Sequence, residues 1–224
     1  MTQTNSGILR GFFDEVLNQR RLDLFPKYFS EEYVGHGSPY VGMGIAPDNS
    51  SGVKVTVRLV IPGSPADGKL MVGDEILRVV DGERTWQTFD ELSQSLWGQG
   101  VPGTSLTVWV RREDGEHEIP LVRGLVPGYD FPYHLVEPSM RVFFKDWPDV
   151  KTRLVKVIEA GDLVAYHAEN QGYNARYGRA AVWAEFGFVR IQDAKIIDWW
   201  SAEDTFSQFK QLGYTIEAPA VVKA

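Results

Sequence analysis

The chain has 224 residues, of which 43% are hydrophobic and 24% charged, and it carries a formal net charge of -7 and no cysteine. This balance is typical of an ordinary globular fold, and the lack of cysteine excludes disulfides, thiolate metal sites and a cysteine nucleophile. The acidic charge argues against a nucleic-acid partner, because proteins that bind phosphate backbones usually gather Lys and Arg on one face.

Neither a membrane span nor a signal peptide is expected. No apolar run approaches the roughly 20 residues that cross a bilayer, and the first ten residues lack a basic start and an apolar core. A cytoplasmic protein without a membrane partner is therefore predicted.

The N-terminal segment is predicted to form two helices. Apolar residues from Ile8 to Leu17 recur at spacings of three and four, which is typical of a helix that buries one face. A polar break follows at 18–21. A second short helix is expected over 22–29, where Pro26 is tolerated only in the first turn.

The middle of the chain, from Val41 to about Arg123, has short β-rich runs separated by glycine. Strands are expected at 53–60, at 75–80 and on both sides of a hairpin across Asp114-Gly115, with one helix at 88–97. These elements suggest a small, partly open barrel.

After residue 128 the pattern changes again. Ser139 is predicted to cap a helix over 139–147. A final helix is expected to open at 201–204 and to end at Gly213. Between these two helices, long strands are expected at 150–160, 162–173, 181–192 and 194–200.

The fold class predicted from this order is α+β, with one domain inserted into another. Two helices at the start lack a sheet, and four strands at the end lack covering helices. The simplest arrangement is a discontinuous domain of residues 1–38 and 126–224, interrupted by a β-rich domain at 39–125, because insertions are tolerated in exposed loops. The phrases YVGHG and YVGMG then mark the end of the first part of the host and the start of the insert, not a repeat.

Five phrases of the outer segments carry a family resemblance. They are FFDEVLNQRRLDLFPKYFSEEYVGHG, KDWPDV, EAGDLVAYHAENQGY, FVRIQDAKIIDWW and SAEDTFSQFKQLG. In this order they resemble the SnoaL-like polyketide cyclase family, within the nuclear transport factor two-like, or cystatin-like, fold. The resemblance implies a cone-shaped, curved mixed sheet with covering helices around an apolar pocket.

Three phrases of the middle segment carry a second resemblance, namely YVGMGIAP, IPGSPADGKLMVGDEILRVVDGE and FDELSQSLWGQGVPGTSLTVWVRR. They resemble the carboxylate loop, core motif and groove helix of a PDZ domain of the bacterial protease-associated type. Such domains bind a peptide C-terminus as an extra strand. The implied peptide site comprises Tyr40, Val41, Gly42, Met43, Gly44, Ile45, Phe89, Leu92, Ser93 and Leu96. Because Pro47 has no N–H, it is expected to shorten the pairing edge, and a lid over the host pocket is the alternative role.

Asp198 is the first catalytic candidate. Strand alternation over 194–200 places Ile196, Asp198 and Trp200 on one face and Ile197 and Trp199 on the other. If the first face points into the cone, Asp198 is a carboxylate beside an indole, poised for proton transfer. The alternative is that Asp198 lies near the sheet edge, either solvated or paired with Arg190 or Lys195.

His36 and Glu185 are the other catalytic candidates. His36 stands at the expected pocket mouth, where an imidazole shuttles protons or serves only the loop structure. Trp183, Glu185 and Gly187 lie two residues apart and so share one strand face. The alternative to a catalytic role for Glu185 is a surface salt bridge. The expected pocket lining is Trp200, Ser201, Tyr166, His167, Trp183 and Asp204. Tyr166, Ala168 and Asn170 share one strand face and His167 and Glu169 the other, so only one set can point inward. Asp204 has an alternative as part of a helix cap with Ser201 as N-cap.

The resemblance also limits the transfer of activity. The catalytic aspartate and the assisting histidine of SnoaL-like aldol cyclases match Ser201 and Gly187 here, which lack a titratable group. The pocket therefore either performs other acid–base chemistry on a small apolar ligand, such as a polyketide-like, carbonyl or ester compound, or it only binds that ligand. In the second case the chain is a scaffold whose PDZ domain recruits a protein.

No cofactor and no metal are expected, because four scattered histidines lack ligand spacing. A homodimer formed through the open sheet face is predicted from the aromatic content of the last strands.

Overall fold

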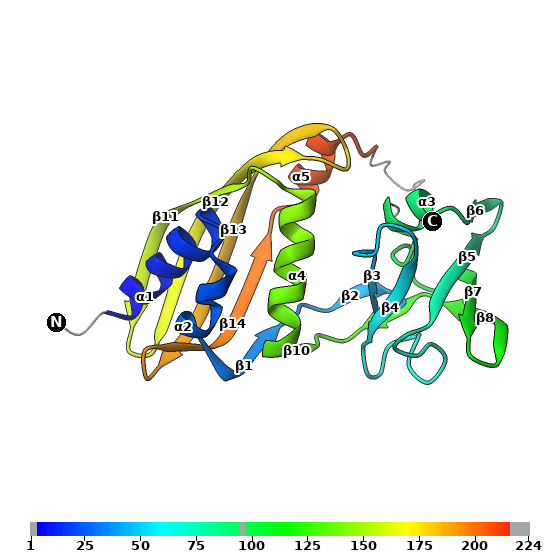
Figure 1. Ribbon diagram of the computed structural model, residues 1–224, viewed down its shortest axis with the longest axis horizontal. Coiled ribbons are helices and arrows are strands. Elements are labelled where there is room, and N and C mark those ends of the chain that lie inside the picture. The colour runs from blue at the N-terminus through cyan, green and yellow to red at the C-terminus, as the bar shows by residue number, and fades with distance from the viewer. Residues whose placement is uncertain (1–3, 95–96, 216–224) are drawn as a thin grey trace, which may run out of the picture. The chain divides into compact units, whose positions relative to one another are not determined.

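The computed structural model describes residues 4–94 and 97–215. Contacts between Cα atoms divide the chain into two compact units. Unit 1 comprises Met1–Gly37 and Asp130–Ala224, and unit 2 comprises Ser38–Tyr129. Figure 1 shows the helices and strands of both units.

Unit 1 is a mixed α+β unit built on one large sheet. Its elements in chain order are α1 (Asn5–Gly11), a π-helical segment (Phe12–Asn18), a 3₁₀ turn (Leu22–Leu24), α2 (Phe25–Tyr28), β1 (Phe29–His36), β10 (Asp130–Pro132), α4 (Tyr133–Asp146), β11 (Lys151–Ala160), β12 (Leu163–Asn174), β13 (Arg179–Gln192), β14 (Lys195–Glu203) and α5 (Thr205–Leu212). The strand order is β10-β1-β14-β13-β12-β11. β1 and β14 run parallel, and the other neighbours are antiparallel.

The sheet of unit 1 curves, and α1, α2 and α4 lie in front of it in Figure 1. Residues predicted to form the buried face of the first helix, from Ile8 to Val16, are almost fully buried against the sheet. The predicted helix at 22–29 is confirmed as a 3₁₀ turn followed by α2, with Pro26 in the first turn of α2. The helical layer therefore covers one face of the sheet and supplies the apolar half of its core.

The helix predicted to start at Ser139 starts earlier. α4 begins at Tyr133, and Ser139 lies inside it, where the Ser139 hydroxyl donates to the Leu135 carbonyl at 2.8 Å. Pro138 also lies inside this helix. The expectation failed because Ser139 bonds back to the preceding turn instead of capping a new one, which serine can also do inside a helix.

β14 contains an irregularity in its pairing with β13. Arg190 pairs with Asp198, but Ile191 pairs with Ile196, so Ile197 is an extra residue on β14. A β-bulge of this kind shifts the alternation of side chains by one position.

The bulge overturns the face predicted for the end of β14. Ile196 is fully buried in the core, and Trp199 packs against the same core. Asp198 and Trp200 instead lie on the opposite face, where Trp200 stacks on the partly exposed ring of Phe188 at 4.9 Å. The prediction that Ile196, Asp198 and Trp200 share one face is therefore wrong.

The last helix of unit 1 is capped differently from the expectation. The Asp204 carboxylate, not Ser201, accepts the N-terminal hydrogen bond of α5, from the Ser207 N–H at 3.0 Å. Ser201 remains within β14. Gly213 ends the helix in the left-handed conformation with φ 97°, as predicted.

Unit 2 is dominated by antiparallel strands. Its elements are β2 (Tyr40–Gly42), β3 (Ile45–Asp48), β4 (Val55–Val60), β5 (Glu75–Asp81), β6 (Arg84–Trp86), α3 (Phe89–Gln94), β7 (Ser105–Arg112), β8 (Gly115–Val122) and β9 (Gly124–Val126). The main sheet has the order β3-β4-β5-β7-β8, with β6 paired to β5, and β2 pairs with β9. The predicted hairpin between β7 and β8 is confirmed, with Arg112 opposite Gly115.

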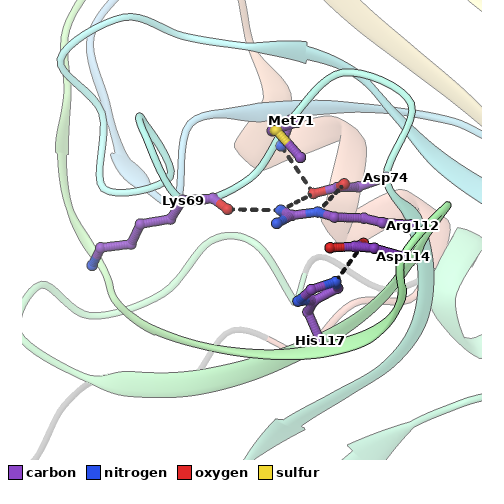
Figure 2. A network of polar contacts seen from close by, with 6 residues as sticks. All are labelled: Lys69, Met71, Asp74, Arg112, Asp114 and His117. Atoms are coloured by element: carbon purple, nitrogen blue, oxygen red, sulfur yellow. Dashed lines mark hydrogen bonds and ion pairs between the residues drawn. The ribbon is translucent and has the colours of Figure 1, made fainter.

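A buried ion pair fixes the turn that precedes β5 to the end of β7 (Figure 2). The Arg112 guanidinium donates to both Asp74 carboxylate oxygens, at 2.7 and 2.8 Å, and to the Lys69 carbonyl at 2.9 Å. The second Asp74 oxygen also accepts from the Met71 N–H at 2.9 Å. Because the Asp74 side chain is 2% exposed, loss of Arg112 leaves a buried carboxylate without its partner, which generally costs about 3–5 kcal/mol.

Gly44, between β2 and β3 of unit 2, has no room for a side chain. Gly44 has φ 85°, and a Cβ built there would lie 2.1 Å from the Ser64 Cβ. The backbone of the loop is thereby held close to the turn at 61–66, where the Ile61 N–H donates to the Gly44 carbonyl and the Ala66 N–H to the Met43 carbonyl.

Within residues 4–94 and 97–215, no helix combines the length and the apolar character that crossing a membrane requires.

Candidate functional site

A cavity of about 330 Å³ lies between the helices and the sheet of unit 1. Its volume falls in the range of small-molecule sites. Most of its wall is apolar and comes from Phe12, Phe13, Leu17, Phe25, Phe29, Tyr33, Val136, Met140, Phe143 and Trp199. Polar groups come from Ser139, Thr152, Asn170, Glu185, Ser201 and Glu203. The cavity thus combines an aromatic wall with two carboxyl groups.

Glu185 on β13 points into this cavity, and two side chains of β12 hold its carboxyl group. The Tyr166 hydroxyl donates to one carboxyl oxygen at 2.5 Å, and the Asn170 side-chain amide donates to the other at 3.3 Å. Burial raises the pKa of Glu185, and these two donors offset part of that rise. Because both oxygens accept hydrogen bonds, the carboxyl group is held in one orientation, while its pKa remains above the ordinary value.

The donors to Glu185 are themselves fixed by further hydrogen bonds. The Trp199 indole N–H donates to the Tyr166 oxygen at 2.9 Å, and the Thr152 hydroxyl donates to the Asn170 side-chain oxygen at 2.6 Å. Burial first, and the nearby Glu185 charge second, raise the pKa of Tyr166 well above its usual value. Tyr166 therefore remains a hydrogen-bond donor at physiological pH.

Glu203 on β14 is the second carboxyl group of the cavity and lies directly opposite Glu185 in the strand pairing. Directly paired residues of antiparallel strands have Cβ atoms about 5 Å apart. Much of the Glu203 residue surface is exposed, yet protein atoms surround its carboxyl group, and it is the carboxyl environment that governs titration. Burial and the adjacent Glu185 charge raise the pKa of Glu203 to about 7.

Trp183 adds a donor beside Glu203. Its side chain is 2% exposed and packs on Trp147 at 4.6 Å between ring centres. The indole N–H of Trp183 is buried and has no hydrogen-bond partner among the described residues, although the indole is close enough to lower the pKa of Glu203. The Trp183 indole therefore lies near the Glu203 carboxyl group without a hydrogen bond between them.

Gly187, which the family resemblance matched to a catalytic histidine, leaves the space that Tyr166 fills. A Cβ at Gly187 would lie 2.6 Å from the Tyr166 hydroxyl and 2.5 Å from the Trp200 carbonyl. Tyr166 on β12 and Gly187 on β13 pair directly with each other. The absence of a side chain at 187 is thus coupled to the tyrosine that orients Glu185.

Two of the three predicted catalytic residues lie on the opposite face of the sheet. The two ring nitrogens of His36 contact Asp130 at 2.9 Å and Asp198 at 3.1 Å, and the ring stacks on Trp200 at 4.3 Å. Arg190 lies 3.8 Å from Asp198. None of these residues lines the cavity. The expected Asp198 in the pocket is therefore not observed, because the bulge turns it outward.

The predicted pocket lining is met in part. Ser201 lines the cavity, and Tyr166 points inward behind Glu185. His167 points outward and stacks on Phe186 at 4.5 Å, so its assignment to the pocket is corrected. Trp200 points away from the cavity because the bulge at Ile197 turns it to the opposite face of the sheet, where it stacks on His36. Trp183 and Asp204 do not line the cavity, since Trp183 is packed in a neighbouring core and Asp204 caps α5.

Sequence reasoning missed Glu203 and gave no role to Asn170 or Thr152. The missing signal for Glu203 is the bulge, since after it the inward positions of β14 are Trp199, Ser201 and Glu203. Asn170 was correctly placed on the same strand face as Tyr166, and that alternation was the signal available for it.

Unit 2 has a groove of about 130 Å³ beside the edge strand β3. Six of the predicted peptide-binding residues line it, namely Tyr40, Met43, Gly44, Ile45, Leu92 and Ser93. Pro47, Trp97, Gly98 and Gln99 line it as well. Phe89 packs against the unit 2 core, Val41 and Gly42 belong to β2, and Leu96 lies outside the described residues.

No protein-family model matches the chain, and no curated protein matches it either. The chain is similar to a SnoaL-like polyketide cyclase from Agrobacterium tumefaciens, with 13% identity, coverage of 95% of this chain and 100% of that one, and a TM-score of 0.49. It is also similar to TsrD from Streptomyces laurentii, with 10% identity, coverage of 95% and 98%, and a TM-score of 0.47. A third similar structure is IdmH from Streptomyces antibioticus, with 14% identity, coverage of 94% and 99%, and a TM-score of 0.45.

Proposed function

We propose that unit 1 is a SnoaL-like, cone-type domain that holds a small apolar ligand in its cavity and transfers a proton to or from it. The family assignment is supported by the five sequence phrases of the outer segments. The chemistry is supported chiefly by one observation, the placement of Glu203 opposite Glu185 at the polar end of an aromatic cavity.

Glu203 is the proton carrier in this proposal. A general acid or base works best when its pKa lies near the operating pH, because both protonation states are then populated. Burial and the Glu185 charge bring the pKa of Glu203 to about 7.

Glu185 is the charged partner that tunes Glu203. Its two oxygens accept from Tyr166 and Asn170, which hold the carboxylate in one orientation. Two carboxyl groups in one site cannot both ionise easily, so a firmly held charge on Glu185 favours the protonated form of Glu203. The two residues thereby take different roles although they are the same amino acid.

The test uses 5-nitrobenzisoxazole, an apolar probe whose ring opens when a base removes its C3 proton and the N–O bond breaks to give a coloured phenolate. We expect the full chain to accelerate this reaction, with a rate that rises as the pH passes about 7 and Glu203 ionises. Glu203→Gln is expected to lower the rate at least about 100-fold, the usual contribution of a positioned base. Absorbance of the phenolate measures the rate.

Glu169→Gln is the matched control, because Glu169 pairs with Arg153 at 2.5 Å and is not among the cavity residues. It should leave the rate unchanged. A Glu203→Gln variant that keeps the wild-type rate contradicts the proposal. Asp198→Asn should also leave the rate unchanged, because Asp198 does not line the cavity.

Unit 2 is proposed to be a PDZ-type domain that binds a peptide C-terminus by strand addition. The Ile61 N–H donates to the Gly44 carbonyl, so the paired residues Ile45 and Val60 do not bond each other, and the N–H of Ile45 points to the open edge of β3. Two residues further on, Pro47 offers no N–H. The edge therefore suits a short pairing followed by a side chain in the groove.

An array of peptides with free C-termini tests this second function. Peptides that end in an apolar residue are expected to bind, and amidation of the same peptides should remove binding, because the carboxylate is held by backbone N–H groups. Equal binding of free and amidated peptides would contradict a PDZ-type site. A lid role for unit 2 stays a prediction.

The homodimer is likewise kept as a proposal. It is supported by apolar side chains that remain exposed on strands of the unit 1 sheet, namely Ile158, Tyr173, Val182, Phe186 and Phe188.

A further inference from the structure

The two carboxyl groups of the cavity have no positive partner. Among the described residues, no Lys, Arg or His side chain lines the cavity, and none forms an ion pair with Glu185 or Glu203. The hydrogen bonds of Glu185 come from neutral groups, the Tyr166 hydroxyl and the Asn170 amide. Buried carboxyl groups without a positive partner tend to stay neutral, which agrees with the raised pKa of both groups, and a cation placed between them would stabilise their ionised forms.

The same cavity is poorly equipped to stabilise negative charge on a ligand. An oxyanion needs free donors or a cation within hydrogen-bond distance. The Asn170 amide, the Tyr166 hydroxyl and the Thr152 hydroxyl already donate within the protein. The hydroxyls of Tyr33 and Ser201 are the remaining donors of the lining, and a ligand carboxylate that they bind would also meet the two glutamate side chains.

The apolar wall adds to the preference for a cation. Aromatic rings supply much of it, from Phe12, Phe13, Phe25, Phe29, Tyr33, Phe143 and Trp199. The face of an aromatic ring attracts a cation, and the attraction is stronger where water is excluded. An ammonium group with an apolar body matches both parts of the cavity, since its charge meets the carboxylates and its body meets the rings.

A metal ion fits the same demand less well. Among residues 4–94 and 97–215, no group of three or more His, Cys, Asp or Glu side chains is arranged to hold one. Hard cations such as Ca²⁺ need about six oxygen ligands, whereas this wall is mainly hydrocarbon.

We infer that the ligand of the unit 1 cavity carries a basic nitrogen and binds as an organic ammonium ion, with its charge between Glu185 and Glu203 and its apolar body among the aromatic rings. This inference rests on the proposed function in so far as it takes the same cavity as the ligand site. It narrows the ligand from any small apolar compound to an apolar amine.

Binding of such a cation is linked to a proton. When an ammonium ion enters while Glu203 is protonated, Glu203 releases its proton to the solvent, and the products are the bound ammonium, ionised Glu203 and one free proton. Glu185, Tyr166 and Trp183 are the groups that face Glu203 in this step, and Tyr166 stays protonated. Because Glu203 with a pKa of about 7 is about half protonated at neutral pH, up to about half a proton is released there for each ligand bound.

Isothermal titration calorimetry of the full chain with three matched probes tests the inference. The probes are 4-phenylbutylamine, 4-phenylbutan-1-ol and 4-phenylbutyrate, which share one apolar body and differ in charge. We expect the amine to bind at least about tenfold more tightly than the alcohol, and the carboxylate to bind most weakly. Titrations in buffers of different ionisation enthalpy should show proton release with the amine alone.

Variants connect the preference to the carboxylates. Glu185→Gln and Glu203→Gln should each reduce amine affinity by about tenfold and leave alcohol affinity unchanged, whereas Glu169→Gln should change neither. The inference is overturned if the alcohol or the carboxylate binds as tightly as the amine, if the amine fails to bind at millimolar concentration, or if both carboxamide variants keep the preference.

The outcome is separable from that of the proposed function. Selective amine binding without base catalysis of 5-nitrobenzisoxazole retains the ligand class and removes the chemistry. Catalysis that needs Glu203, without selectivity for the amine, retains the chemistry and removes the ligand class.

Discussion

Replacing Glu203 with glutamine is expected to stabilise unit 1 at about pH 8 and to leave its stability nearly unchanged at about pH 4. The pKa of Glu203 is raised from 4.5 to about 7 in the folded chain. Below 4.5 the carboxyl group is protonated in the folded and unfolded states alike, so it has no differential effect. As the pH rises towards 7, the unfolded state loses the proton first, and the free energy of unfolding falls.

The size of this effect follows from the shift in pKa. A rise from 4.5 to about 7 corresponds to roughly 3 kcal/mol for a fully buried group. Because solvent reaches part of Glu203, we expect about 1–2 kcal/mol, or a few degrees in the melting temperature. Glu185, whose pKa is also raised, contributes in the same direction.

Hydrogen exchange of the β12, β13 and β14 amides in denaturant measures unit 1 without interference from unit 2. Glu169→Gln serves as the matched control, since Glu169 is paired with Arg153 and does not line the cavity. A gain for Glu203→Gln that is equally large at both pH values would contradict the assignment. Together with loss of base catalysis, a gain at high pH alone would mark Glu203 as a residue kept for function at the expense of stability.

Gly187→Ala is expected to destabilise unit 1 by about 3 kcal/mol or more and to disturb the orientation of Glu185. The added Cβ would lie 2.5 Å from the Trp200 carbonyl and 2.6 Å from the Tyr166 hydroxyl. The first contact is with the backbone of a neighbouring strand, which cannot move away without breaking the pairing of β13 with β14. The second displaces the donor that holds Glu185.

The loss in the free energy of unfolding is measured by hydrogen exchange of the β12, β13 and β14 amides in denaturant. Gly161→Ala is the comparison, because it adds the same methyl group where no atom lies within 4 Å, at φ 66°. Its cost should be limited to the strain of a left-handed residue, about 1 kcal/mol. Equal losses for the two variants would show that the contact with Tyr166 and Trp200 has no special weight. In any Gly187→Ala protein that folds, the pKa of Glu203, read by carboxyl NMR, should move from that of the wild type.

The two predictions depend on one cross-strand arrangement. Tyr166 pairs with Gly187, and Glu185 pairs with Glu203. The missing side chain at Gly187 makes room for the tyrosine, the tyrosine holds the first carboxylate, and that carboxylate raises the pKa of the second. A substitution at Gly187 is therefore expected to change the pKa of Glu203.

Local patterns predicted most of the elements well. The buried face from Ile8 to Val16, the hairpin between β7 and β8 and the stop at Gly213 follow from spacing, turn residues and helix-cap chemistry that lie within a few residues of each other. The alternation along β12 also placed Tyr166 and Asn170 together on one face. Where a signal is contained in neighbouring residues, the sequence alone is enough.

Errors arose where a distant segment decides the local geometry. Ser139 satisfies its hydroxyl inside α4, a role that a capping pattern does not distinguish. His36 contacts Asp130 and Asp198, which lie far from it in sequence, and β1 must pair with both β10 and β14 before they can meet.

By itself, the sequence determined most of the helices and strands of this protein and the aromatic character of its N-terminal helical face, and it named Glu185 as a candidate without deciding whether its side chain points inward. Only the tertiary structure decided which carboxylate stands opposite Glu185. The extra residue Ile197 turns Asp198 out of the cavity and Glu203 into it. The physical reason is that alternation is exact along an unbroken strand, whereas a bulge is set by the register with the neighbouring strand, which no local pattern of residues contains.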